Sequence, residues 1–105
     1  MSEAQIEEAA RLFRTLSEPA RLRVVKALMA GPLTVGELVS ATGLKQGNVS
    51  KHLGILHAAD LVSREREGNF IRYTISDSCL YDLCLLVCGK LERDARQRLA
   101  NLTTA

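Results

Sequence analysis

Gly43 is the residue that most constrains the fold, because it separates two short amphipathic segments. The segment before it begins with Thr-x-x-Glu at 34–37, a pattern that predicts an N-terminal capping box. Its apolar side chains fall on one side of a helix: Val35, Leu38 and Val39. Glycine often ends a helix, and only Leu44 and Lys45 lie between Gly43 and the next helical pattern. Two short helices joined by a tight turn that contains glycine form a helix-turn-helix.

The second of these segments, 46–58, has an apolar face and an unusually bare outer face. Its apolar stripe has helical spacing and consists of Val49, Leu53 and Leu56. The opposite face collects Gly47, Ser50, Lys51 and Gly54. Each glycine costs a helix about 1 kcal/mol relative to alanine, so this face indicates a use other than helix stability. A helix that enters the major groove of DNA, a slot about 12 Å wide, needs such a face, because its backbone must approach the bases.

The flanking sequence completes a recognisable order of elements. Helical spacing predicts helices over about 3–16 and from Pro19 to about Met29, and a last helix over about 78–100. Between the motif and the last helix, alternation over 61–75 predicts a β-hairpin with its tip at Glu67-Gly68-Asn69. The order α-α-α-α-β-β-α predicts a mainly α fold with a small β-hairpin (α+β), the winged helix-turn-helix. We expect residues 1–105 to form a single DNA-binding domain with its recognition helix at about 46–58 and its wing at about 61–75.

The residues expected to contact DNA follow from this layout. On the recognition helix, short polar and basic side chains near the N-terminus suit base edges and phosphates: Gln46, Gly47, Asn48, Ser50, Lys51 and His52. On the wing, side chains able to reach phosphates or the minor groove are Arg64, Arg66, Asn69 and Arg72. The position of His52, about 60° from the apolar stripe, is also typical of a half-buried, hydrogen-bonded histidine. Taken alone the helix also fits an ordinary solvated surface helix, and the arginines of the hairpin favour DNA.

Three stretches of the chain resemble the ArsR/SmtB family of winged-helix repressors. They are SEPARLRVVKAL at 17–28, VSKHLGILHAADLV at 49–62 and REGNFIRYTI at 66–75. The resemblance implies a homodimer whose recognition helices and wings grip a palindromic operator of double-stranded DNA and release it when an inducer binds. It implies groove-reading residues at Gln46, Gly47, Ser50 and Lys51, with the wing around Gly68 and Asn69. The chain departs from the metal-sensing members, since the third helix has no Cys-x-Cys and Lys90 and Arg93 replace zinc ligands on the last helix.

The last helix carries an apolar stripe and all three cysteines of the chain. The stripe consists of Leu80, Leu83, Cys84, Val87, Cys88, Leu91, Ala95 and Leu99. Together with the first helix it would form the dimer interface that the family resemblance implies. Cys84 and Cys88, one turn apart, could share a soft ion such as arsenite, or Cys79, Cys84 and Cys88 could respond by oxidation or persulfidation. The alternative is that the cysteines only fill the seam, because free cysteine is often buried.

Composition narrows the remaining classes of function. No apolar run of about 18 residues exists, so no membrane span is expected, and the acidic start MSEAQIEEAARLF is not that of a signal peptide. We therefore expect a cytoplasmic protein that needs no cofactor. A net charge of +2 is too small to indicate nucleic acid by itself. An enzyme is disfavoured, since no glycine-rich phosphate loop or nucleophile–base pair is found. A winged helix that binds protein would need aromatic anchors, and the chain has only 2 Phe and 2 Tyr.

Overall fold

The computed structural model describes residues 1–103. In it the helix-turn-helix begins and ends where the local sequence signals predict. Helix α3 (Val35–Thr42) starts at a reciprocal capping box, in which the Glu37 amide donates to Thr34 Oγ1 (3.2 Å) and the Thr34 amide to Glu37 Oε1 (2.9 Å). It ends at Gly43, whose φ of 73° is the left-handed conformation that glycine adopts without strain. Helix α4 (Gln46–Ala58) follows directly.

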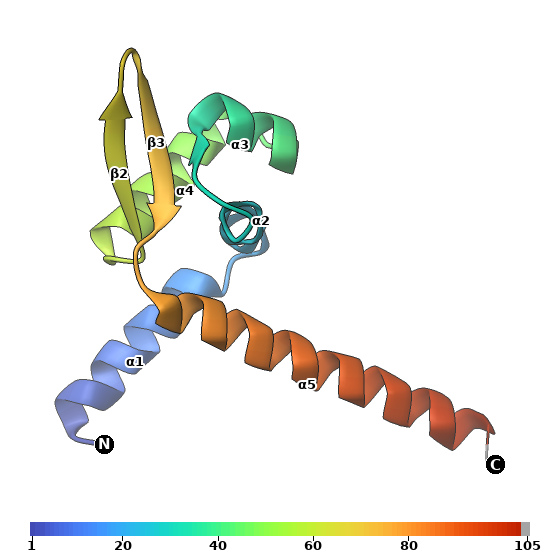
Figure 1. The fold of residues 1–105 in the computed structure, drawn as a ribbon. Coiled ribbons are helices and arrows are strands. Elements are labelled where there is room, and N and C mark those ends of the chain that lie inside the picture. The colour runs from blue at the N-terminus through green and yellow to red at the C-terminus, as the bar shows by residue number, and fades with distance from the viewer. Residues whose placement is uncertain (104–105) are drawn as a thin grey trace.

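All the predicted elements are present, in the predicted order. Helices α1 (Glu3–Leu16) and α2 (Pro19–Leu28) precede the motif, and strands β2 (Val62–Glu67) and β3 (Phe70–Ile75) follow it. Helix α5 (Ser78–Thr103) comes last and extends away from the winged body, as Figure 1 shows. The winged helix-turn-helix prediction is therefore confirmed.

The sheet has one strand more than predicted. A short strand β1 (Leu33–Thr34) pairs with β3 in antiparallel fashion, which gives a three-stranded sheet of order β1-β3-β2. The hairpin lies where it was predicted, with a tighter tip: Glu67 belongs to β2 and pairs with Phe70, which leaves only Gly68 and Asn69 as the turn. Gly68, at φ 63°, supplies the left-handed residue that such a tight turn needs. The extra strand joins the base of the wing to the helix-turn-helix.

One hydrophobic core holds the winged body together; every element except β1 contributes a buried residue to it, and Leu33 of β1 packs against it partly buried. The buried apolar residues are Leu16, Val24, Val25, Leu28, Leu38, Val49, Leu53, Leu56, Val62, Tyr73 and Leu80. Three of them form the predicted apolar stripe of α4, so this helix is fixed in rotation about its own axis. Its opposite face must therefore point outward.

Helices α1 and α5 leave apolar side chains uncovered within one chain. Of the stripe predicted on α5, Leu80 is buried and Leu83 and Cys84 are partly buried, whereas Leu91 further along is 58% exposed. On α1, Phe13 is 57% exposed. The sequence prediction of the stripe did not include Leu86, which lies on another side of α5 and is 70% exposed. Exposed apolar side chains of this kind on two helices are typical of a protein–protein interface.

Candidate nucleic-acid interface

The outer face of α4 is exposed along its length. The predicted contact residues that lie on it are Gln46, Gly47, Asn48, Ser50 and Lys51, and all are exposed. Within residues 1–103 no side chain caps the N-terminus of α4, and the first amide bonded in the helical pattern is that of Val49, which donates to the Lys45 carbonyl (3.0 Å). A helix N-terminus with free amides and a positive dipole end favours a phosphate. The geometry therefore offers donors to both base edges and backbone.

The two glycines of this face are not required by the chain's own packing. Apart from its chain neighbours and the local backbone of α4, no atom of residues 1–103 lies within 4 Å of a Cβ atom built at Gly47 or at Gly54. Neither residue has a positive φ, so the backbone conformation does not demand glycine either. Glycine at these two positions therefore does not improve the packing of the folded chain, and it lowers the helix propensity of α4. What they provide is a flat outer surface that another molecule can approach closely.

His52 does not belong to this surface. Its side chain is only 3% exposed and lies on the inner side of α4, so the prediction that it contacts DNA is wrong. The hydrogen bond expected for a buried histidine is also missing at one atom, since Nδ1 is buried without a partner among the described residues. Burial lowers the pKa of His52, and the nearby Arg21 lowers it further, although Glu18 acts in the opposite direction. His52 is therefore a neutral core residue.

Arg21 is a second buried polar residue, and the sequence reasoning did not predict it. Arg21 lies on α2 and is 7% exposed as a residue, and its Nη1 donates to the Thr15 carbonyl at the end of α1 (2.6 Å). Its Nη2 pairs with the Glu18 carboxylate (3.1 Å). A signal was present, because Arg21 continues the apolar stripe of Val24, Val25 and Leu28 at helical spacing. Arg21 thus ties α1 to α2 beneath the recognition helix.

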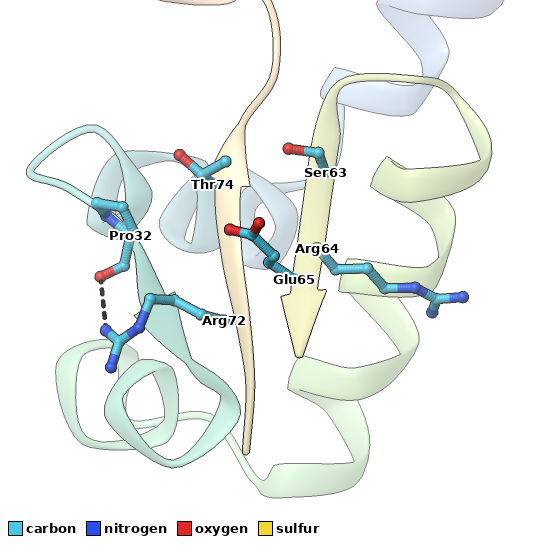
Figure 2. A pocket seen from close by; sticks show the side chains of 6 residues that line it. All are labelled: Pro32, Ser63, Arg64, Glu65, Arg72 and Thr74. Atoms are coloured by element: carbon cyan, nitrogen blue, oxygen red, sulfur yellow. Dashed lines mark hydrogen bonds between the residues drawn. The ribbon is translucent and has the colours of Figure 1, made fainter. Parts of the chain in front are cut away.

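The three arginines of the wing do not form one basic surface. Arg64 and Arg66 lie opposite Tyr73 and Ile71 in the β2–β3 register, so they share one face of the hairpin. Arg72 is on the other face, and Figure 2 shows Arg64 and Arg72 projecting to opposite sides of the hairpin, with Arg72 toward Pro32. We therefore separate Arg72 from the other wing arginines.

Arg72 is held by three groups of the chain itself. Its Nε donates to Glu67 Oε2 (2.8 Å), and its Nη1 lies 3.4 Å from Glu37 Oε1 and from the Pro32 carbonyl. The bond and charge of Glu67 raise the pKa of Arg72 above its usual value. The pKa of Glu37 is lowered, first by the capping-box bonds from Thr34 and then by Arg72. Both groups of the Arg72–Glu37 pair thus stay charged.

The tip of the wing combines polar and apolar groups. Asn69 is exposed, and Arg66 Nε donates to the Gly68 carbonyl across the turn (3.3 Å). Phe70 and Ile71 are also exposed. For Ile71 this differs from the sequence prediction, in which the alternation of Ile71, Tyr73 and Ile75 indicated one buried face of the strand. This part of the hairpin projects beyond the helical body in Figure 1.

The cysteines of α5 do not converge in one chain. Cys79 and Cys88 are exposed and Cys84 is partly buried. Burial raises the pKa of Cys84, and the neighbouring Cys88 raises it further. Within residues 1–103 no three side chains of the His, Cys, Asp or Glu type gather to hold a metal ion.

The same part of the chain contains no helix both long and apolar enough to cross a bilayer.

Comparison with known proteins gives consistent relatives. Residues 18–64 match the model of the bacterial regulatory protein, arsR family. The uncharacterized HTH-type transcriptional regulator Rv0081 of Mycobacterium tuberculosis is 35% identical over 96% of this chain and 90% of its own length. Its crystal structure superimposes with a TM-score of 0.83 over 93% of this chain and 99% of that one.

Two further solved structures are similar. The homodimeric winged helix-turn-helix DNA-binding domain of Mb0332 from Mycobacterium bovis has a TM-score of 0.82 at 26% identity, covering 92% of this chain and 93% of that one. The AntR antimony-specific transcriptional repressor has a TM-score of 0.81 at 32% identity, over 90% of this chain and 86% of that one. The outer face of α4 and the wing are thus set on the scaffold of known regulators, and the chain belongs to the arsR family of bacterial DNA-binding transcriptional regulators.

Proposed function

We propose that the protein is a homodimeric repressor that inserts the outer face of α4 into the major groove of an inverted-repeat operator. The observation that carries this proposal is the contrast between the two faces of α4. One face is buried in the core, while the other is exposed, polar and flattened by Gly47 and Gly54, around whose Cβ positions 4 Å of space is open. Arg64 and Arg66 on the wing supply phosphate contacts, and Asn69 lies at the wing tip. Residues 1–105 act as one DNA-binding domain, in the cytoplasm where the bacterial chromosome lies.

The dimer rests on α1 and α5. Their uncovered apolar side chains include Ile6, Phe13, Val87, Leu91 and Leu99, each more than two-fifths exposed in the single chain. Covering such a stripe with its own copy removes it from water, which is favourable by roughly 25 cal/mol for each Å² of apolar surface. The homodimeric neighbour from Mycobacterium bovis supports this assembly. A two-fold pair of recognition helices reads a two-fold symmetric DNA site.

The proposal is tested by fluorescence anisotropy with a duplex selected for affinity from a random pool. Repeating the titration across salt concentrations gives the number of phosphate contacts, because each one contributes about −0.9 to the slope of log K against log salt. Lys51→Ala should flatten the slope by about 0.9 for each protomer and weaken binding. Glu92→Gln on α5, away from the proposed interface, is the control and should leave the slope unchanged. Binding that does not change with salt would reject the proposal.

We further propose that a thiol-reactive inducer acts at α5. All three cysteines of the chain lie on this helix, and Cys84 and Cys88 occupy adjacent turns where its exposed apolar stripe begins. A soft metal or metalloid ion such as arsenite, or oxidation or persulfidation, would add bulk or a cross-link there and shift the two recognition helices. The similarity to AntR, an antimony-specific repressor, supports an inducer of the metalloid class. No resident cofactor is required.

The competing proposal is that the cysteines only pack the dimer seam. Each cysteine is changed to serine in turn, and operator release is measured with arsenite, peroxide and persulfide. Sensing predicts that at least one variant binds the operator normally and no longer releases it. If all three variants release as the wild type does, the cysteines are packing residues and the inducer is of another kind.

A further inference from the structure

Arg72 connects the wing to two groups near the start of the helix-turn-helix that are far from it in the sequence. It lies on β3, and its guanidinium reaches Glu67 at the end of β2, the Pro32 carbonyl before β1 and Glu37 in the first turn of α3. The last two partners are separated from it by 40 and 35 positions along the chain. Figure 2 shows the Arg72 side chain directed toward Pro32 rather than along Arg64. The planar fork of an arginine suits such a multiple contact.

The connection joins the wing to the first helix of the helix-turn-helix. Glu37 is the residue that closes the capping box of α3, so its carboxylate is already fixed by the Thr34 amide (2.9 Å). The β1–β3 ladder meets the same place, because Thr34 is the register partner of Arg72. Beyond this point toward the tip, the described hairpin has no third strand beside it. The direction of the wing relative to α3 and α4 is therefore set around Arg72.

Arg64 and Arg66 differ from Arg72 in this respect. Within residues 1–103, Arg72 is the only wing arginine that forms ion pairs, one with Glu37 and one with Glu67. Arg64 and Arg66 lie on the other face of the hairpin with no carboxylate partner in that part of the chain. A phosphate would meet them without competition from a carboxylate, whereas at Arg72 it would have to displace two carboxylates.

We propose that Arg72 is a positioning residue, which holds the wing at the angle that DNA binding requires by bridging Glu67 to the capping box of α3. It makes no phosphate contact of its own. This inference rests on the proposed function, since the wing has an angle to keep only if it meets DNA together with α4. It also replaces the sequence-based prediction that Arg72 contacts DNA directly.

The first test compares Arg72 with Arg64 in the salt titration of operator binding. Arg64→Ala should flatten the slope by about 0.9 for each protomer, because a phosphate contact is lost. Arg72→Ala should weaken binding up to about fivefold, the range of exposed ion pairs, and leave the slope unchanged. Arg72→Lys should bind as poorly as Arg72→Ala, because a single ammonium cannot reproduce the fork. A phosphate contact predicts the reverse: a flatter slope for Arg72→Ala and near-normal binding for Arg72→Lys.

The second test uses Glu37→Gln, which keeps the capping box because glutamine also serves there, and removes the ion pair. Positioning predicts weaker operator binding in the wild-type background and no further loss when Arg72→Ala is already present. The matched control is Glu65→Gln, an equal charge change at the cross-strand neighbour of Arg72, which is not one of its ion-pair partners. Glu65→Gln should not weaken binding. Stronger binding by Glu37→Gln would mean that Glu37 competes with a phosphate for Arg72, and would overturn the inference.

A third measurement needs no DNA and separates this inference from the proposed function. Amide hydrogen exchange of the free protein should become faster over Phe70–Ile75 in Arg72→Ala, while exchange in α4 stays as in the wild type. Unchanged protection of β3 would overturn the positioning role, whatever the DNA measurements give. If instead Arg64→Ala and Lys51→Ala leave the salt slope unchanged while β3 loses protection, the proposed DNA surface is wrong and the structural bridge stands.

Discussion

Substitutions at the two glycines of α4 separate the contribution of this helix to folding stability from its contribution to operator binding. Gly54 lies in the interior of α4, and a Cβ atom there meets nothing within 4 Å. Gly54→Ala should therefore gain the full difference in helix propensity, about 1 kcal/mol of unfolding free energy. For a chain of this size that corresponds to a rise in Tm of about 4–8 °C. A more stable free protein is the expected result.

Gly47 tests the opposite side of the same argument. Gly47→Leu places a side chain in open space, so the free protein should fold as well as the wild type. In the operator complex the leucine would hold the helix away from the groove. Loss of one or two base-edge contacts, each worth about 1–3 kcal/mol, predicts binding weaker by roughly tenfold or more. The matched control is Gly36→Leu, which also changes the second residue of a helix, α3, where a Cβ again meets nothing within 4 Å.

The assays are thermal unfolding by circular dichroism for the free protein and anisotropy at fixed salt for the operator. The reasoning requires both results together: unchanged or higher Tm, and weaker binding for Gly47→Leu but not for Gly36→Leu. Normal operator affinity in Gly47→Leu would show that α4 does not approach DNA by this face. A lower Tm in Gly54→Ala would show that the face is already covered in the free protein.

Three further predictions concern stability and assembly. Burial lowers the pKa of His52 below its ordinary value near 6.5. Between these two values the unfolded chain binds more protons at His52 than the folded chain does. The free energy of unfolding should therefore fall as the pH drops below about 6.5. His52→Leu should lack this part of the loss in urea unfolding at pH 7.5 and 5.5, and an equal loss in the variant would contradict the assignment. Thr34→Ala removes the acceptor of the Glu37 amide and should cost about 1 kcal/mol in the same unfolding assay; no loss would mean the capping box is not stabilising. Leu91→Arg on α5 should yield monomers with weak operator binding in sedimentation and anisotropy, whereas Leu22→Arg on α2 should remain dimeric. A dimeric Leu91→Arg would place the interface elsewhere.

The sequence predicted those parts of the fold that depend on neighbours along the chain. The capping box at Thr34, the stop at Gly43 and the stripe through Val49 and Leu53 are local patterns, and each predicted the element that is found. Strand β1 was missed because two residues cannot show an alternating pattern. Its existence depends on Arg72 and Tyr73 of β3, which are distant in sequence.

The candidate site could be predicted only in part for the same reason. The exposed residues of α4 follow from periodicity, since the opposite face is apolar. His52 lies at the margin of the apolar stripe, where an angle of about 60° does not decide between core and surface, and the buried Arg21 beneath it was not foreseen. Arg72 was assigned to DNA because its charge is visible in the sequence, whereas its partner Glu37 is 35 positions away.

The central claim is that the outer face of α4 enters DNA, and amide chemical shifts of the free and bound protein test it most directly. Glycine amides fall in a distinct region of the nitrogen–proton spectrum, and the chain places Gly47 and Gly54 on α4 and Gly89 on α5. Addition of operator duplex should move the resonances of Gly47 and Gly54 strongly and leave Gly89 in place. Large shifts at Gly89 with Gly47 and Gly54 unmoved would contradict the claim.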